Sequence, residues 1–317
     1  MNLVSNNSDS PRWLHWLAVL TALLTLPLLF LGAGVTSHGV GMVDPRGFRP
    51  PWEIVNGLLE NSGLDWRLEY GHRTFGFLVG MCGIVLAVGC WFGDRRPWIG
   101  WMGLLALTLI CIQGSLGIFR VDYNALHGRT FAMVHGVFAQ IVFAVLVSIA
   151  VLTARSARFA EDWEASPALK RWSLITTSII FGQLVLGGIT RHQDSLLGPR
   201  GHLLGAFVVV IAVIWLLKLI RESERFTLAR VAFMGLLALQ LLLGMESWLS
   251  KYFVATSVTH EAIVPVPMHA EWVRTLHYVV GSMILATSVS VAILAQRKPV
   301  HAVEPILETS RRLEGVA

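Results

Sequence analysis

The stretch HRTFGFLVGMCGIVLAVGCWFG, residues 72–93, decides the fold class of this chain. It contains a single charged side chain, that of Arg73, and as a helix it is long enough to cross about 30 Å of hydrocarbon. Comparable apolar stretches recur along the 317 residues. We place them at 13–34, 72–93, 98–119, 131–153, 172–190, 202–220, 229–249 and 275–296. The sequence therefore predicts an all-α integral membrane protein with eight transmembrane helices.

The distribution of Lys and Arg predicts the orientation of these helices in the membrane. The side that holds the amino terminus carries 15 of these residues and the opposite side carries 10, with the greater density in the short loops of the first side. Since basic loops stay in the cytoplasm, both termini are predicted to be cytoplasmic. The net charge of +5 reflects these basic residues at the cytoplasmic ends of the helices, which suit an anionic lipid surface. Basic and aromatic residues are not interleaved along the chain, so the sequence does not indicate a nucleic-acid partner.

An internal repeat divides the chain into two halves. The motif Gly34-Val-Thr-Ser-His38 is followed by Pro45-Arg-Gly47, and Gly188-Ile-Thr-Arg-His192 is followed by Pro199-Arg-Gly201 at the same spacing. Each half contains four predicted helices, an even number, so the two repeats are parallel and not inverted. We predict one four-helix bundle in residues 1–155, a cytoplasmic linker at 156–171, a second bundle in residues 172–298 and a polar tail at 299–317.

Four histidines stand just inside the same end of the even-numbered spans, which places them toward the outer face. A buried imidazole in a membrane is costly and is usually functional. In the repeat, His72 corresponds to His202 and His135 corresponds to His277, so each bundle receives one pair. We interpret the pairs as axial ligands of two haem irons. Capping or hydrogen bonding by each histidine is the alternative. Zinc or copper is less favoured, since no Cys or carboxylate joins each of the two pairs at close sequence spacing.

A carboxylate precedes the first of these histidines by three residues. Glu69 and His72 would share one face of a helix, which puts Glu69 beside whatever His72 binds. A carboxylate at the rim of an apolar pocket can transfer a proton or stabilise a cation. A plain ion pair between Glu69 and Arg73 explains the same residues.

These motifs together resemble the haem A synthase family over nearly the whole chain. The resemblance rests on Glu69-x-x-His72-Arg73, on the later spans that begin with histidine, and on Gly187-Gly-Ile-Thr-Arg-His192. It implies eight helices in two parallel halves. It also implies oxidation of the C8 methyl group of haem O to a formyl group, through a hydroxymethyl intermediate, which gives haem A for cytochrome oxidase.

The resemblance assigns roles to the site residues. His72 and His135 would flank the substrate haem O, with Glu69 as the catalytic carboxylate beside it. His202 and His277 would hold a haem b cofactor that passes electrons. The inserted oxygen could come from O₂ at the iron or from water that attacks a carbocation, and a carboxylate at Glu69 would serve either route.

Partners and further contacts also follow from the resemblance. A farnesyltransferase that forms haem O would supply the substrate, cytochrome oxidase would receive the product, and membrane lipid would surround both. Arg73 and Arg191 are candidate contacts for haem propionates. The sequence departs from some members of the family, because residues 35–71 contain no cysteine pair.

Two other classes of protein remain as alternatives. A dihaem b-type cytochrome that carries electrons would use four histidines equally well, although it would not need Glu69. A transporter is less favoured, because transporters commonly place ionisable groups near the midplane and these histidines lie toward one face.

Overall fold

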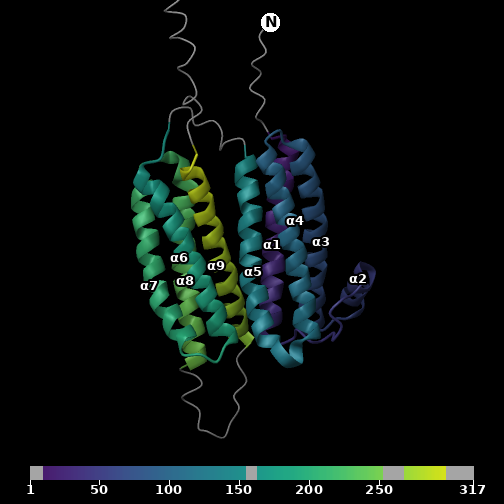
Figure 1. Cartoon of the computed structure of the whole chain (residues 1–317). Coiled ribbons are helices and arrows are strands. Elements are labelled where there is room, and N and C mark those ends of the chain that lie inside the picture. Colours follow the sequence, from purple (N-terminus) through teal and green to yellow (C-terminus); the bar gives the residue numbers. More distant parts are fainter. Residues whose placement is uncertain (1–9, 155–162, 253–267, 298–317) are drawn as a thin grey trace, which may run out of the picture.

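The computed structural model describes residues 10–154, 163–252 and 268–297 (Figure 1). The described residues form helices joined by turns and loops. In chain order, the helices are α1 (Arg12–Ser37), α2 (Pro51–Glu60), α3 (Leu64–Gly93), α4 (Pro97–Asp122), α5 (Asn124–Thr153), α6 (Pro167–His192), α7 (Leu197–Ile220), the short 3₁₀ helix η1 (Glu224–Phe226), α8 (Thr227–Tyr252) and α9 (Met268–Ala295).

Eight of these elements are long and apolar enough to cross a membrane, which confirms the predicted fold class. Among the described elements, α2 and the three-residue η1 are too short to do so. The sequence did not reveal α2, because its ten residues lack the long apolar run that identifies a span. The spans also extend beyond their predicted limits: α3 begins at Leu64 and α6 at Pro167. Polar first turns continue these helices outside the apolar stretches, and hydropathy does not detect such turns.

Local sequence explains where several helices begin. Pro51, Pro97 and Pro167 stand in the first turns of α2, α4 and α6, where the missing N–H of proline costs nothing. The Ser166 side chain also accepts a hydrogen bond from the Leu169 amide at 3.2 Å and so caps α6. In α5, His127 has non-helical angles (φ −140°, ψ 20°), so the regular helix starts close to the predicted position 131.

The long helices form two groups that lie side by side (Figure 1). In the first group α1 packs on α3 and α5, and α4 packs on α3 and α5. In the second group α6 packs on α7 and α9, and α8 packs on α9, whereas α7 and α8 touch only slightly. The groups meet where α1 and α5 contact α9 and where α5 contacts α6. This arrangement is consistent with the predicted repeat. We call the end where α1 finishes and α3 begins the outer end, after the predicted orientation.

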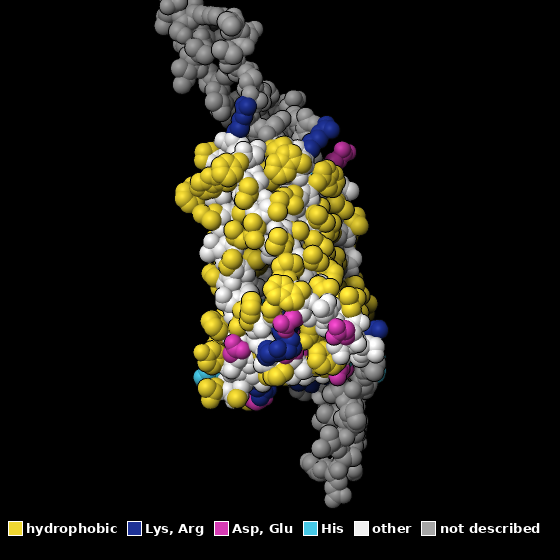
Figure 2. Space-filling model, turned by 90° about the vertical axis from the view of Figure 1, so that its right-hand side faces the viewer, with side chains coloured by type: hydrophobic (Ala, Val, Ile, Leu, Met, Phe, Trp, Pro, Cys, Tyr) yellow, Lys and Arg dark blue, Asp and Glu magenta, His cyan; other side chains and the backbone are white. Residues whose placement is uncertain are grey.

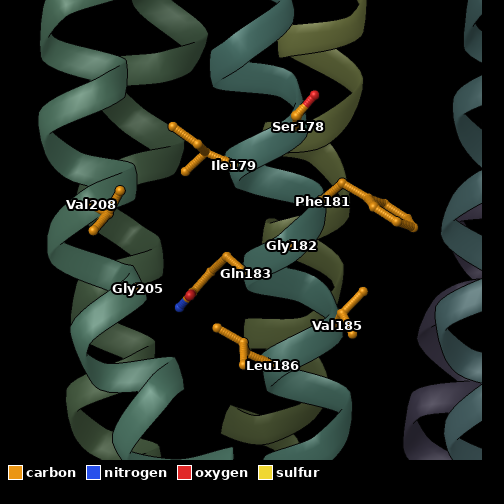
Figure 3. Close-up of a pocket in the computed structure, with 9 residues that line it drawn as sticks. All are labelled: Ser178, Ile179, Phe181, Gly182, Gln183, Val185, Leu186, Gly205 and Val208. Atoms are coloured by element: carbon orange, nitrogen blue, oxygen red, sulfur yellow. The ribbon is translucent and has the colours of Figure 1, made fainter.

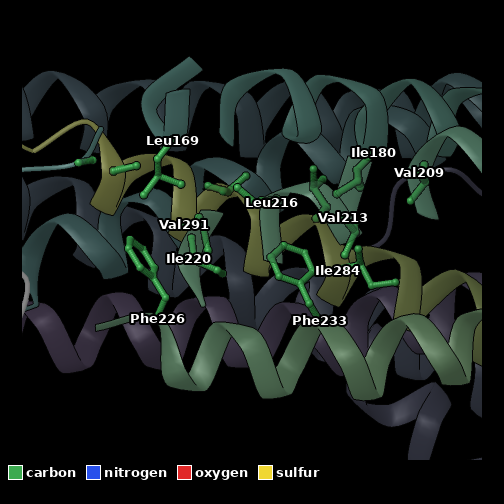
Figure 4. Close-up of a cluster of buried hydrophobic side chains, with 14 of the residues drawn as sticks. Leu169, Ile180, Val209, Val213, Leu216, Ile220, Phe226, Phe233, Ile284 and Val291 are labelled. Atoms are coloured by element: carbon green, nitrogen blue, oxygen red, sulfur yellow. The ribbon is translucent and has the colours of Figure 1, made fainter. Parts of the chain in front are cut away.

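Each group has its own apolar core. The core of the second group draws side chains from α6, α7, η1, α8 and α9, and Leu216, Ile220, Phe226 and Phe233 in it are fully buried. Figure 4 shows these side chains meeting between the helices. The first group has a separate core around Leu14, Leu86, Leu146 and Ile149. Close packing of this kind holds helices together in lipid, where no water is displaced between them.

The surface suits a surrounding bilayer. Figure 2 shows that apolar side chains cover the middle of one face, while Lys, Arg, Asp and Glu gather toward its two ends. Large apolar side chains such as Phe92, Leu204, Ile211 and Leu228 are exposed. Exposed apolar side chains are favourable where the surrounding medium is the hydrocarbon of a lipid bilayer.

Two predicted segments fall partly or wholly outside the described residues. Of the predicted linker 156–171, the structure describes 163–171, and residues 167–171 already belong to α6. The predicted tail 299–317 lies outside the described residues.

Candidate functional site

The four predicted histidines meet in two pairs. His72 of α3 faces His135 of α5, with ring centroids 6.2 Å apart and ring planes at 75°. His202 of α7 faces His277 of α9, with centroids 6.1 Å apart and planes at 79°. All four side chains are partly buried. The two groups of helices therefore carry histidine pairs of nearly identical geometry.

A glycine of a neighbouring helix supports each histidine ring. A Cβ atom added to any of these four glycines would stand within 3.3 Å of the Cε1 atom of the ring, closer than an ordinary van der Waals contact. Only a residue without a side chain therefore leaves the ring in its observed place. The distances from the added Cβ atom to Cε1 are 2.7 Å for Gly32 and His72, 3.3 Å for Gly117 and His135, 3.1 Å for Gly187 and His202, and 3.0 Å for Gly244 and His277.

Main-chain carbonyls orient one histidine in each pair. Nδ1 of His72 lies 3.1 Å from the carbonyl oxygen of Leu28, and Nδ1 of His202 lies 3.2 Å from that of Gln183. A carbonyl oxygen only accepts, so Nδ1 carries the proton in both rings. The Nε2 atom is then left with a free lone pair, which is the state that a metal ion requires.

Three glutamines form a feature that sequence reasoning missed. Gln113, Gln183 and Gln240 each stand four residues before one of the supporting glycines. The Gln113 amide donates to the His135 carbonyl oxygen at 3.1 Å, the Gln183 amide donates to that of His202 at 2.8 Å, and Nε2 of Gln240 lies 3.3 Å from Nε2 of His277. The signal that could have revealed them is the spacing Gln-x-x-x-Gly, which occurs at all three places.

Buried polar atoms near both pairs lack partners within the described residues. These atoms are Oε1 of Gln113, Gln183 and Gln240, and Nδ1 of His277. An unpaired buried polar atom is costly, and native proteins contain few of them. Their concentration beside the histidines indicates a site shaped for a bound group.

Glu69 is buried and fully engaged. Its Oε1 accepts a hydrogen bond from Arg73 at 2.6 Å, and its Oε2 accepts hydrogen bonds from the amides of Val43 at 2.9 Å and Asp44 at 3.3 Å. The carboxylate thus ties the loop after α1 to α3, one helical turn outward from His72. The ion pair with Arg73, one of the two interpretations of this motif, is present in the structure.

The two candidate propionate contacts lie in different surroundings. Arg73 also donates to the carbonyl oxygens of Arg46 at 2.9 Å and Asp44 at 3.2 Å, so its guanidinium holds the loop. Arg191 reaches from α6 to the other group of helices, where its Nη2 donates to the Ala33 carbonyl and to Ser37 Oγ, both at 2.7 Å. Ser37 is the residue that matches Arg191 in the repeat, so the two positions contact each other.

A pocket of about 600 Å³ opens between α6 and α7 beside the second histidine pair. Figure 3 shows Ile179, Gln183 and Leu186 pointing from α6 toward α7. The lining is apolar except for Ser178 and Gln183, and the Gln183 amide binds the His202 carbonyl. The pocket therefore brings an apolar opening close to His202.

This fold and site define a polytopic helical membrane protein with a histidine pair inside each of two helix groups. Residues 58–198, from the end of α2 to the start of α7, match the family COX15-CtaA, whose description is cytochrome oxidase assembly protein. The match covers less than half of the chain, and the description of the family supports a role in the assembly of cytochrome oxidase. The match includes the first histidine pair and Arg191. No curated protein and no solved structure matches the chain.

Proposed function

We propose that this protein is a haem A synthase, an oxidoreductase that converts the C8 methyl group of haem O to a formyl group. In this proposal His72 and His135 hold the substrate haem O, while His202 and His277 hold a haem b cofactor that transfers electrons. The recurrence of one histidine geometry in both helix groups, with ring centroids 6.2 and 6.1 Å apart, is the observation that carries the proposal.

The residues around both pairs fit a haem. Bonds between imidazole nitrogen and a transition metal are about 2 Å long, so two rings on one metal ion have centroids about 6 Å apart. The glycines under the rings keep the histidines in place, and the orientation of His72 and His202 leaves Nε2 free to ligate. A bound haem supplies a redox-active iron beside the methyl group to be oxidised.

The chemistry proceeds in two oxidations. The first converts the methyl carbon to a hydroxymethyl carbon, and the second gives a gem-diol that loses water to leave the aldehyde. Each oxidation removes two electrons from the carbon and adds one oxygen atom to it. If the oxygen comes from O₂, O₂ takes these two electrons together with two more electrons and two protons, and its second oxygen atom leaves as water. If the oxygen comes from water, two electrons and two protons leave the site, and O₂ is the final oxidant. Glu69 holds a negative charge one turn outward from His72, where it can accept a proton or stabilise positive charge at the methyl carbon.

The setting in the membrane suits this substrate. Haem O and haem A are too apolar to move freely in water, so both remain in the lipid phase around the helices. A farnesyltransferase that makes haem O would act before this protein, and cytochrome oxidase would take up the haem A. We place the protein in the cell membrane with both termini cytoplasmic and the histidines toward the outer face.

The proposal is tested by expressing the chain with and without a haem O-forming farnesyltransferase. Every haem in the purified protein is then identified by chromatography with mass detection. We expect haem A, or its hydroxymethyl precursor, only when haem O is supplied. Haem b alone in both conditions, without conversion, would contradict the synthase and favour a dihaem electron carrier.

A pair of variants assigns the role of Glu69 in the same experiment. Glu69→Gln keeps the shape of the side chain but removes its charge, and we expect conversion to fall at least about tenfold with both haems still bound. The control is Glu53→Gln, which makes the same change in α2 at the same outer end, where Glu53 pairs with Arg49. An equal loss in both variants would indicate anchoring of the loop and not catalysis by Glu69.

A further inference from the structure

Three arginines on three helices lie at the outer end, near the level of the two histidine pairs. Arg120 lies near the end of α4, Arg191 near the end of α6 and Arg274 near the start of α9. Arg191 lies within electrostatic range of both others, and Arg120 lies within electrostatic range of His72 and His135. We call Arg120, Arg191 and Arg274 the outer arginine cluster.

All three arginines stand about one helical turn outward from the histidine sites. Arg120 follows Gly117, the glycine under His135, by three residues, and Arg191 follows Gly187, the glycine under His202, by four. Arg274 precedes His277 by three residues on the same helix. At 1.5 Å per residue, the Cα atom of each arginine lies about 4.5–6 Å further out than the residue of its own helix at the level of the rings.

The described residues provide no carboxylate that pairs with this cluster. Within the residues that the structure describes, Arg120 and Arg274 make no hydrogen bond or ion pair, and Arg191 uses only Nη2, on α1. Glu69, a carboxylate within electrostatic range of Arg120, is already bound to Arg73 and two amides. Partly buried like charges without a counter-ion are unfavourable, so this arrangement calls for an anionic ligand.

The outer loop covers this position. A Cβ atom added to Gly41 would stand 2.7 Å from Nη2 of Arg120, so the main chain of the loop passes directly over the guanidinium. A ligand that reaches Arg120 therefore comes from the side of the histidines, inside the helix group, and not from the water beyond the loop.

We propose that the outer arginine cluster binds the propionate carboxylates of the tetrapyrroles held by the two histidine pairs. Arg120 serves the first pair, Arg274 the second, and Arg191 lies between them, whereas Arg73 holds the loop. This inference rests on the proposed function. The chemistry is that of guanidinium with carboxylate, a charge-assisted and often bidentate contact. A tetrapyrrole held by a histidine pair would then be oriented with its carboxylates toward the arginines.

The test compares iron protoporphyrin IX with its dimethyl ester, which lacks the charged carboxylates. Binding is titrated by absorption in the full-length chain with His202→Ala and His277→Ala, so that the first pair alone can ligate. We expect the diacid to bind at least about tenfold more tightly than the diester. Arg120→Gln should remove this preference and leave the affinity for the diester unchanged, which shows at the same time that the fold is intact.

Arg129→Gln is the matched control, because Arg129 lies at the same end but is exposed and paired with Asp194. It should keep the preference for the diacid. The inference is overturned if Arg120→Gln keeps the preference, or if it weakens both ligands equally. It is also overturned if the diacid and the diester bind equally to the parent chain while inorganic phosphate stabilises the parent chain but not Arg120→Gln. That result would assign the cluster to a free anion. Failure of any tetrapyrrole to bind the first pair would instead contradict the proposed function.

Discussion

The contact between a histidine ring and a helical glycine is the feature that repeats at the scale of single residues. It occurs four times, and it is tightest at Gly32, where an added Cβ would lie 2.7 Å from Cε1 and 2.9 Å from Nδ1 of His72. The ring cannot easily yield, because its Nδ1 also binds the Leu28 carbonyl on the same helix as Gly32. A methyl group at this position therefore has to displace the histidine.

Gly32→Ala is expected to weaken haem binding at the first pair at least about tenfold, since overpacking of this kind costs roughly 1–3 kcal/mol. Binding at His202 and His277 should be unchanged. The measurement is the haem content of the purified variant, resolved by absorption titration of each pair. Gly80→Ala is the control, because an added Cβ at Gly80 meets no atom within 4 Å. Equal haem content in both variants would show that the ring moves aside without loss.

At the scale of elements, a cluster of charges fixes the outer loop and α2 to the start of α3. Asp44 is almost fully buried, and it accepts hydrogen bonds from Arg49, from the Tyr70 hydroxyl at 2.8 Å and from the Arg46 amide at 3.2 Å. Burial alone would raise the pKa of Asp44, but the hydrogen bonds from Arg49, Tyr70 and Arg46 outweigh it and hold this pKa well below its usual range.

Asp44→Asn should loosen the loop without unfolding the helices, because it removes the one buried charge that Arg49 and Arg73 share. We expect amide hydrogen exchange in residues 38–50 to accelerate at least about tenfold, as breaking a buried pair is strongly destabilising. Asp65→Asn is the matched control, since Asp65 is exposed in the first turn of α3. Unchanged exchange in Asp44→Asn would remove Asp44 from the anchoring of the loop.

The sign of the pH dependence follows from the lowered pKa of Asp44. A carboxyl whose pKa is lower in the folded state stabilises that state above its unfolded pKa of about 3.9, and this stabilisation is lost only as pH falls through the folded value. The loop of the parent chain should therefore stay protected from exchange, after correction for intrinsic rates, between pH 7 and about pH 4. Loss of protection already near pH 5 would contradict this prediction.

At the scale of the whole molecule, polar contacts join the two helix groups at the depth of the histidines. The Tyr278 hydroxyl donates to the Gly136 carbonyl at 2.9 Å, and these residues directly follow His277 and His135. Further out, Thr275 donates to Ser37 at 3.0 Å and His38 lies 3.2 Å from Glu271. The two histidine pairs therefore belong to one packed body, with α1 beginning and α9 ending at the same end (Figure 1).

The orientation of this body is tested with the same substitution at opposite ends. Ser195 lies in the outer connection between α6 and α7, and Ser223 lies between α7 and η1. After replacement of the three native cysteines by alanine, Ser195→Cys should react with a membrane-impermeant maleimide in intact cells. Ser223→Cys should react only after permeabilisation, because basic connections stay in the cytoplasm. The reverse pattern would invert the orientation.

Sequence alone determined the properties that depend on local composition and spacing. The eight spans follow from apolar runs such as residues 72–93, because hydrocarbon demands length and hydropathy of each helix separately. The pairing of His72 with His135 was also predictable, since the repeat and the even-numbered spans placed both at one depth. Limits of helices were less accurate, as at Leu64, because polar turns beyond the bilayer carry no hydropathy signal.

Only the tertiary structure decided which groups meet across helices. It set the Arg73 guanidinium against carbonyl oxygens of the outer loop, brought Arg120 toward the first histidine pair with no partner among the described residues, and packed Gly32 against His72. These contacts join residues that are close together in space but mostly far apart in the chain. Their geometry depends on how helices rotate and pack against one another, and that is a property of the whole bundle which no single span contains.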